Sequence, residues 1–101
     1  MKKEIRIALA QVNLTVGDLR GNQDKIIQYI QQAKKYQADI IAFPELSVTG
    51  YPPEDLLLKP QFIEDNKQSV KKITEFCNNI TAIIGFADKN QQLYNAAAII
   101  H

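Results

Sequence analysis

Short apolar segments alternate along this chain with longer amphipathic ones, and this alternation limits the folds open to it more than any other feature. A strand covered on both faces is rich in Ile, Ala and Val with little polar interruption, as residues 4–12 are. The pattern predicts strands at 4–12, 40–43, 81–86 and 93–101, and helices from about 22 to 35 and from 61 to 80. Strands that alternate with helices in this way predict an α/β architecture.

The first expected helix has a clear apolar face. Ile26, Ile30 and Ala33 follow one another at i, i+4 and i+7, which places them on one side of a helix. Asn22 ends a run of residue types that form turns and cap helices, so we expect the helix to begin near it. This face is expected to pack into the core.

A long segment, residues 45–60, separates the second strand from the second helix. It contains a glycine at 50 and prolines at 52, 53 and 60, which predicts a loop with at most one turn of helix near Glu54. Its Leu, Val and Tyr content argues against disorder, and long ordered loops in compact domains are usually functional. A second polar turn is expected at residues 87–92.

Composition excludes several classes of protein. The 12 basic and 11 acidic residues give a net charge of +1, so there is no electrostatic case for binding nucleic acid or an anionic membrane. A hydrophobic content of 46% in 101 residues supports a single core. The longest apolar runs, of about five residues, are far short of the roughly 20 that span a bilayer. With one cysteine no internal disulfide can form, and the cytoplasm is the expected compartment.

The strongest local candidate for chemistry is Glu45, within FPELSVTGYPPEDLL (43–57). It follows the carboxyl end of a buried-type strand, where open α/β sheets place the groups that contact ligands. A carboxylate there suits a general acid or base. From the residues alone the favoured role is structural, in which Glu45 caps a loop or a helix end, because surface glutamates are abundant. Glu54 and Asp55 are expected to serve the first turn of a short helix.

Other reactive side chains fit structural roles better. Cys77 shares an apolar helical face with Ile73 and Ile80, which predicts core packing for the thiol. His101 is the only histidine and the last residue, which argues against a metal site or a catalytic dyad. The glycines lack the spacing of a phosphate-binding loop. Tyr51 fits either a buried anchor for the long loop or the wall of a ligand pocket.

Two stretches, AQVNLTVGDLRGN (10–22) and ADIIAFPELSVTGYPPEDLLL (38–58), resemble the carbon-nitrogen hydrolase (nitrilase) superfamily. The first motif of that superfamily is an apolar strand that ends in a proline and the catalytic glutamate, and it matches Phe43, Pro44 and Glu45. The extension TGYPPEDLLLKPQF (49–62) is similar to the glutaminase domains of glutamine-dependent NAD synthetases. The resemblance covers essentially the whole chain.

This resemblance implies a Glu-Lys-Cys triad, in which the cysteine attacks the amide of L-glutamine, the glutamate is the general base and the lysine helps to hold the tetrahedral intermediate. Only Glu45 matches a member of the triad, because the lysine and cysteine motifs of the family lie downstream of residue 101. Cys77, Lys59 and Lys89 are therefore not assigned to it. Tyr51 matches a tyrosine that the family places near the glutamine pocket. No cofactor or metal site is expected within these residues.

The implied fold is the N-terminal part of a four-layer α-β-β-α sandwich, with residues 1–101 forming part of the carbon-nitrogen hydrolase (glutaminase) domain. A synthetase domain outside this chain would use ATP and Mg²⁺ to amidate deamido-NAD to NAD. The full-length protein is expected to be a homo-oligomer. Two alternatives remain: an amidase of the same superfamily without a synthetase domain, and a non-catalytic binding module. We expect the isolated 101 residues to be inactive and to expose apolar faces.

Overall fold

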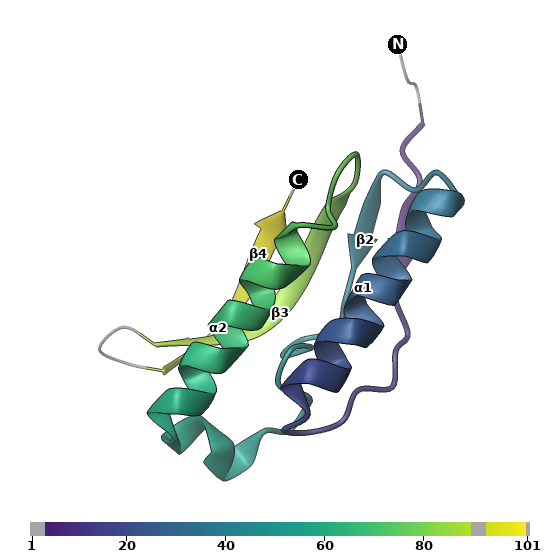
Figure 1. The fold of residues 1–101 in the computed structure, drawn as a ribbon. Coiled ribbons are helices and arrows are strands. Elements are labelled where there is room, and N and C mark those ends of the chain that lie inside the picture. Colours follow the sequence, from purple (N-terminus) through teal and green to yellow (C-terminus); the bar gives the residue numbers. More distant parts are fainter. Residues whose placement is uncertain (1–3, 90–92, 101) are drawn as a thin grey trace.

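A computed structural model of the chain describes residues 4–89 and 93–100 (Figure 1). Its elements follow one another as β1 (Ile7–Leu9), α1 (Leu19–Lys35), β2 (Ile40–Ala42), the 3₁₀ helix η1 (Glu54–Leu58), α2 (Pro60–Thr74), β3 (Thr81–Lys89) and β4 (Leu93–Ile100). The predicted α/β order is confirmed, and η1 lies where one turn of helix was expected, with Glu54 and Asp55 in its first turn.

The four strands form one sheet in the order β1-β2-β3-β4. The first three are parallel, in a register that aligns Leu9 with Ala42 and Ala42 with Ile83, whereas β4 runs antiparallel to β3. Helices α1 and α2 are the crossovers between the parallel strands and lie side by side over the sheet (Figure 1). Because β1 and β2 are parallel neighbours, the loops that follow them leave the sheet at the same edge.

The core lies between the two helices and the sheet. Ile26, Ile30 and Ala33 are buried on α1, as their spacing predicted. They pack in one cluster with residues from α2, the strands and the loops between them, including Ile41, Phe43, Val48, Ile73, Cys77, Ile80, Ala82 and Ile84. The prediction of core packing for Cys77 is confirmed.

A buried asparagine joins α2 to β3. The side chain of Asn66 is fully buried, and its Nδ2 donates to the carbonyl oxygens of Ile63 at 2.6 Å and Ala87 at 2.7 Å. Its Oδ1 accepts a hydrogen bond from the backbone N–H of Ala87 at 2.9 Å. This side chain is thus paired at both ends, as a buried amide must be to avoid a desolvation penalty.

The prediction that strand 4–12 is covered on both faces is wrong. The regular strand is only Ile7–Leu9, at the edge of the sheet, where Ile7 is 57% and Leu9 is 76% exposed. On β4, Ile99 is 68% exposed as well. Both helices pack on the same face of the sheet, and no helix of the described residues covers its other face (Figure 1).

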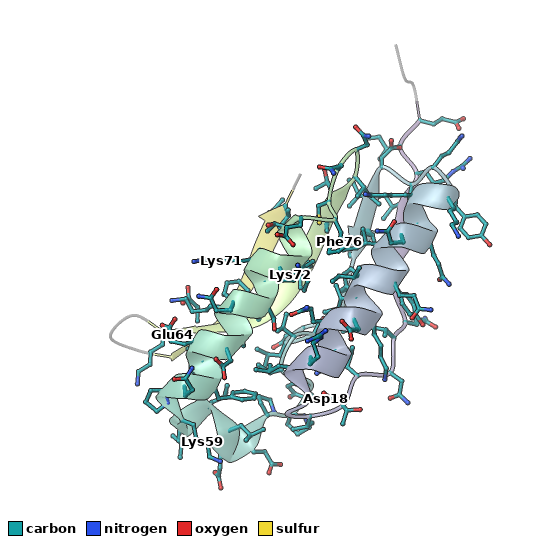
Figure 2. The ribbon with its side chains drawn as sticks, viewed as in Figure 1. Asp18, Lys59, Glu64, Lys71, Lys72 and Phe76 are labelled. Carbon is teal, nitrogen blue, oxygen red and sulfur yellow. The ribbon has the colours of Figure 1, made fainter. Side chains whose placement is uncertain are left out.

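Two element boundaries near α1 and α2 also differ from the prediction. Helix α1 begins at Leu19 instead of near Asn22, because Asp18 is its N-cap and accepts a hydrogen bond from the backbone N–H of Gly21 at 2.9 Å (Figure 2). Helix α2 ends at Thr74, well before residue 80. Turn and irregular residues occupy the rest of the interval before β3.

Strand β3 is longer than predicted. It continues to Lys89, so Ala87, Asp88 and Lys89 belong to the strand and not to a turn. The reason is tertiary: β4 pairs with them, with Asp88 opposite Tyr94. The remaining residues of the predicted turn, 90–92, and the last residue of the predicted strand, His101, lie outside the described residues.

Candidate active site

Two loops meet at the carboxyl edge of the parallel strands. Residues 10–18 follow β1, and residues 43–53 follow β2 and carry Glu45. The backbone N–H of Gly17 donates to the carbonyl oxygen of Thr49 at 2.9 Å, which joins the two loops directly. Glu45 therefore lies at the edge where the sequence predicted it, among the loops that α/β proteins use to bind ligands.

The backbone makes a short excursion out of the sheet at Glu45. Before it, the N–H of Phe43 donates to the carbonyl oxygen of Ile83 at 2.9 Å; after it, the N–H of Val48 donates to the carbonyl oxygen of Gly85 at 3.1 Å. Residues 44–47 lie between these two anchor points on β3. The excursion puts Glu45 on the surface and brings the chain back to the sheet within a few residues.

This excursion is a tight turn with its own internal contacts. Leu46 has a φ of 49°, a left-handed conformation that non-glycine residues seldom adopt. The hydroxyl of Ser47 donates to the carbonyl oxygen of Pro44. The hydroxyl of Thr49 lies 2.9 Å from the carbonyl oxygen of Gly50 and 3.2 Å from that of Leu46, and its single proton is donated to one or shared between them. The backbone on both sides of Glu45 is thus held by local hydrogen bonds.

A pocket of about 220 Å³ opens beside the carboxylate. It is lined by Val12, Asn13 and Leu14 from the first loop and by Pro44, Glu45, Leu46 and Tyr51 from the second. Glu45 and Tyr51, the two site residues predicted from the sequence, therefore share one pocket. Tyr51 is 68% exposed, so the alternative in which it is a buried loop anchor is wrong.

The two loops are joined by Asn22, which sequence reasoning treated only as a possible helix cap. It lies within α1, fully buried. Its Nδ2 donates to the carbonyl oxygens of Thr15 at 2.8 Å and Val48 at 3.0 Å, and its Oδ1 accepts from the N–H of Thr15 at 2.9 Å. An asparagine four residues before Ile26, in line with the apolar face of the helix, was the sequence signal that could have revealed this role.

The backbones of the loops also touch at Gly50. A Cβ at this position would lie 2.7 Å from the Cα of Val16, and Gly50 has a φ of +79°. Glycine is therefore required here both for its conformation and for the close approach of the first loop. Together with Asn22, this contact fixes the two sides of the pocket relative to each other.

The remaining candidates lie away from Glu45. Cys77 precedes β3, at the end of the parallel sheet opposite to the edge that carries Glu45, and it is buried. Burial raises the pKa of the Cys77 thiol, and the ammonium of Lys34 lowers it by a smaller amount. A buried thiol kept neutral is a poor nucleophile. Lys59 is the exposed residue before α2, and Lys89 is exposed at the end of β3.

Larger hollows elsewhere on the surface fit a ligand site less well. One of about 390 Å³ is lined by residues of the segments before β2 and β3, such as Gln37, Asp39 and Asn79. It lies at the amino edge of the parallel strands, opposite to the edge at which α/β sheets bind ligands. Among residues 4–89 and 93–100, no cluster of His, Cys, Asp and Glu could hold a metal ion, and no helix is long and apolar enough to cross a membrane.

The chemistry open to this arrangement is that of a positioned carboxylate. Glu45 lies on a hydrogen-bonded turn beside a small pocket, where a carboxylate can take a proton from a group that enters the pocket and return it later. The described residues that line this pocket include neither a cysteine nor a lysine.

Comparison with known proteins identifies the family. A family model described as carbon-nitrogen hydrolase matches residues 6–101. The chain is 40% identical over 100 residues to a glutamine-dependent NAD(+) synthetase of Thermotoga maritima, and the match covers 97% of this chain but 17% of that protein. It is thus similar to about one sixth of a much longer relative.

Solved structures agree with this assignment. The glutamine-dependent NAD(+) synthetase of Acinetobacter baumannii, solved in complex with ADP, superposes with a TM-score of 0.89 at 40% identity, over 95% of this chain and 18% of that one. An amidase from Nesterenkonia sp. has the same fold, with a TM-score of 0.79 at 21% identity over 94% of this chain and 37% of that one. The sheet and its two helices form part of the nitrilase-superfamily α-β-β-α sandwich predicted from the sequence. The chain therefore belongs to the carbon-nitrogen hydrolase family, and its counterpart among the relatives is the N-terminal part of glutamine-dependent NAD(+) synthetases.

Proposed function

We propose that this chain supplies the general base of a glutamine-hydrolysing site in a glutamine-dependent NAD(+) synthetase. The observation that carries the proposal is the placement of Glu45, on a tight turn at the carboxyl edge of the sheet, in one pocket with Tyr51. The family match supports hydrolysis of a carbon-nitrogen bond as the reaction, since carbon-nitrogen hydrolases act on such bonds. The relatives named above are glutamine-dependent, which supports glutamine as the substrate.

In this proposal the catalytic cysteine and lysine lie outside residues 1–101, as the resemblance to the family implies. Glu45 takes the thiol proton of that cysteine, and the thiolate attacks the side-chain carbonyl carbon of L-glutamine. The lysine stabilises the oxyanion of the tetrahedral intermediate. The intermediate collapses to a thioester as the amide nitrogen leaves, and Glu45 returns the proton to the departing ammonia.

Hydrolysis of the thioester completes the cycle. Glu45 accepts a proton from an attacking water molecule, the carbon–sulfur bond breaks, and glutamate leaves as the thiolate recovers the proton. A thiol of pKa near 8.5 is mostly protonated at neutral pH, so a nearby carboxylate base increases the thiolate available for attack. Tyr51, at the rim of the pocket, would contact the bound glutamine.

The ammonia would serve a second reaction, the amidation of deamido-NAD to NAD with ATP and Mg²⁺. The glycines of the two loops beside Glu45 do not favour a phosphate site among the described residues. A Cβ at Gly50 would lie 2.7 Å from the backbone of Val16, and a Cβ at Gly17 would lie 3.1 Å from Cδ1 of Leu56, so these glycines are explained by packing within the chain. In the proposal, ATP and Mg²⁺ therefore bind a part of the protein outside these residues.

The substitution Glu45→Gln in the full-length protein tests the proposal, because it keeps the size of the side chain and removes the base. We expect glutamine-driven NAD formation to fall by about 10²- to 10⁴-fold, while NAD formation from added ammonia is retained. Glu54→Gln, in η1 directly after that loop, is the matched control and should leave both activities unchanged. Full glutamine-driven activity in Glu45→Gln would contradict the proposal.

The same assay separates the two alternatives. An amidase without a synthetase part would release ammonia from an amide but would form no NAD with either nitrogen source. A non-catalytic binding module would show neither activity in the unmodified protein. Glutamine- and ammonia-driven NAD formation by one protein would exclude both.

A further inference from the structure

The turn that carries Glu45 rests on a glycine of the neighbouring strand. Gly85 lies in the interior of β3, within TAIIGFADK, and its carbonyl oxygen receives the N–H of Val48 where the chain returns to the sheet. A glycine inside a strand weakens it, because it adds backbone entropy to the unfolded chain and has no side chain to pack. The presence of a glycine at this position of β3 therefore calls for an explanation in the residues around it.

The reason at Gly85 is steric and not conformational. Its φ lies outside the left-handed range, so an L-residue could adopt the same backbone. A Cβ, however, would lie 2.5 Å from the backbone nitrogen of Leu46, 3.0 Å from the carbonyl oxygen of Pro44 and 3.1 Å from the carbonyl carbon of Glu45. All three are backbone atoms, which cannot rotate away as the end of a side chain can.

These atoms are the peptide groups on both sides of Glu45. A side chain at position 85 would therefore push directly on the backbone that carries the carboxylate. The turn has little freedom to yield elsewhere, since Phe43 and Val48 tie it to β3 and the hydroxyl of Ser47 closes it onto Pro44. The displacement would be transmitted to the position and direction of the Glu45 side chain.

We propose that Gly85 and Ser47 are positioning residues for Glu45. Gly85, which has no side chain, lets the turn pack directly against β3, and the hydroxyl of Ser47 holds the turn together through its hydrogen bond to Pro44. The inference rests on the proposed role of Glu45 as general base and adds the residues that set its geometry. Neither residue lines the pocket, so neither is expected to contact the substrate. Their effect should appear in the chemical step and not in glutamine binding.

The first test is Gly85→Ala in the full-length enzyme, with kcat and KM for glutamine measured separately. A displaced base should lower kcat by about 10- to 100-fold, the range that small misplacements of catalytic groups produce, while KM changes by less than about twofold. NAD formation from added ammonia should be unchanged. A wild-type kcat in a folded Gly85→Ala protein would overturn the inference.

A matched control separates positioning from a general loss of stability. Ile84→Val alters the preceding residue of β3, whose side chain is fully buried among the core residues. It should lower the melting temperature and leave kcat for glutamine unchanged. An equal fall of kcat in both variants would mean that any destabilisation of β3 has this effect, and would also overturn the inference.

Ser47→Ala keeps the inference testable if Gly85→Ala does not fold. Ser47 is 1% exposed, and the substitution removes only its hydroxyl oxygen, so the fold should tolerate it. We expect kcat for glutamine to fall about three- to tenfold with KM unchanged, as the turn loosens. Wild-type kcat in Ser47→Ala would overturn the proposed role of the turn closure.

The result for Glu45→Gln distinguishes failure of this inference from failure of the proposed function. If Glu45→Gln is inactive with glutamine while Gly85→Ala and Ser47→Ala have wild-type kcat, only the positioning role is wrong. If Glu45→Gln itself is fully active, the proposed function fails and the positioning role fails with it.

Discussion

The side-chain amide of Asn22 donates a 3.0 Å hydrogen bond to the carbonyl oxygen of Val48, a residue 26 positions away in the loop that carries Glu45. The same amide group also pairs with both the N–H and the carbonyl of Thr15, in the loop on the other side of the pocket. One buried side chain in α1 therefore ties together the two loops that form the candidate site.

Replacing Asn22 with alanine should destabilise this junction. It removes the partner of the carbonyl oxygen of Val48, a fully buried residue, and a buried polar group left unpaired costs roughly 1–3 kcal/mol. We expect Asn22→Ala in the full-length protein to lower the melting temperature by several degrees, measured by thermal unfolding. Gln28→Ala, at an exposed position of the same helix, is the control, with an expected change within about 0.5 kcal/mol. Equal stability of the two variants would contradict the role of Asn22.

Tyr51 is expected to act on glutamine binding. It lines the pocket from an exposed position, so its removal should take away contact with the substrate and little packing. We predict that Tyr51→Ala raises KM for glutamine about tenfold with a smaller effect on kcat, in steady-state assays of the full-length protein. Tyr36→Ala alters a tyrosine that is 75% exposed at the end of α1 and should leave KM unchanged. A KM unaffected by Tyr51→Ala would exclude a role in binding.

Cys77 should be protected from alkylation in the folded protein. Its side chain is 3% exposed, and burial raises the pKa of the thiol above its usual range. Iodoacetamide labelling of the peptide that contains Cys77, followed by mass spectrometry, should be slow at pH 8 in the native protein and fast after denaturation. Rapid labelling of the native protein would show that this residue is not in the core.

The raised pKa of Cys77 also sets the sign of a pH effect. The folded state binds the thiol proton more tightly than the unfolded state, so the stabilisation from this group is complete below about pH 9 and is lost as the pH rises through the folded pKa. Cys77→Ser, which does not titrate in this range, should lose less stability between pH 8 and pH 11 than the unmodified protein does. An identical pH dependence would exclude this contribution.

Isolated residues 1–101 should expose an apolar sheet face. Ile7, Leu9 and Ile99 are each more than half exposed, so a dye that binds apolar surface should fluoresce strongly with this chain. The chain should release no ammonia from glutamine. An ammonia signal that is lost on Glu45→Gln would contradict this prediction. A sharp cooperative unfolding transition without dye binding would instead favour the binding-module alternative.

The order of elements and much of the core could be predicted from the sequence, because they depend on local periodicity. The i, i+4, i+7 spacing of Ile26, Ile30 and Ala33 identified a buried helical face, and the structure confirms it. The long loop with one turn of helix at Glu54 also follows from local glycine and proline chemistry. Element ends were less predictable: β3 extends to Lys89 only because β4 supplies its hydrogen-bonding partners.

The sequence by itself determined that Glu45 follows a strand and begins a long loop, since strand periodicity and a proline mark that boundary. Its resemblance to a family led to the role proposed for this glutamate. Only the tertiary structure decided which groups hold Glu45 in place. Asn22, Ser47 and Gly85 act through contacts with backbone atoms, and two of them, Asn22 and Gly85, reach segments distant in the sequence. A sequence pattern records which face a side chain occupies, but it does not record which distant backbone lies against that face.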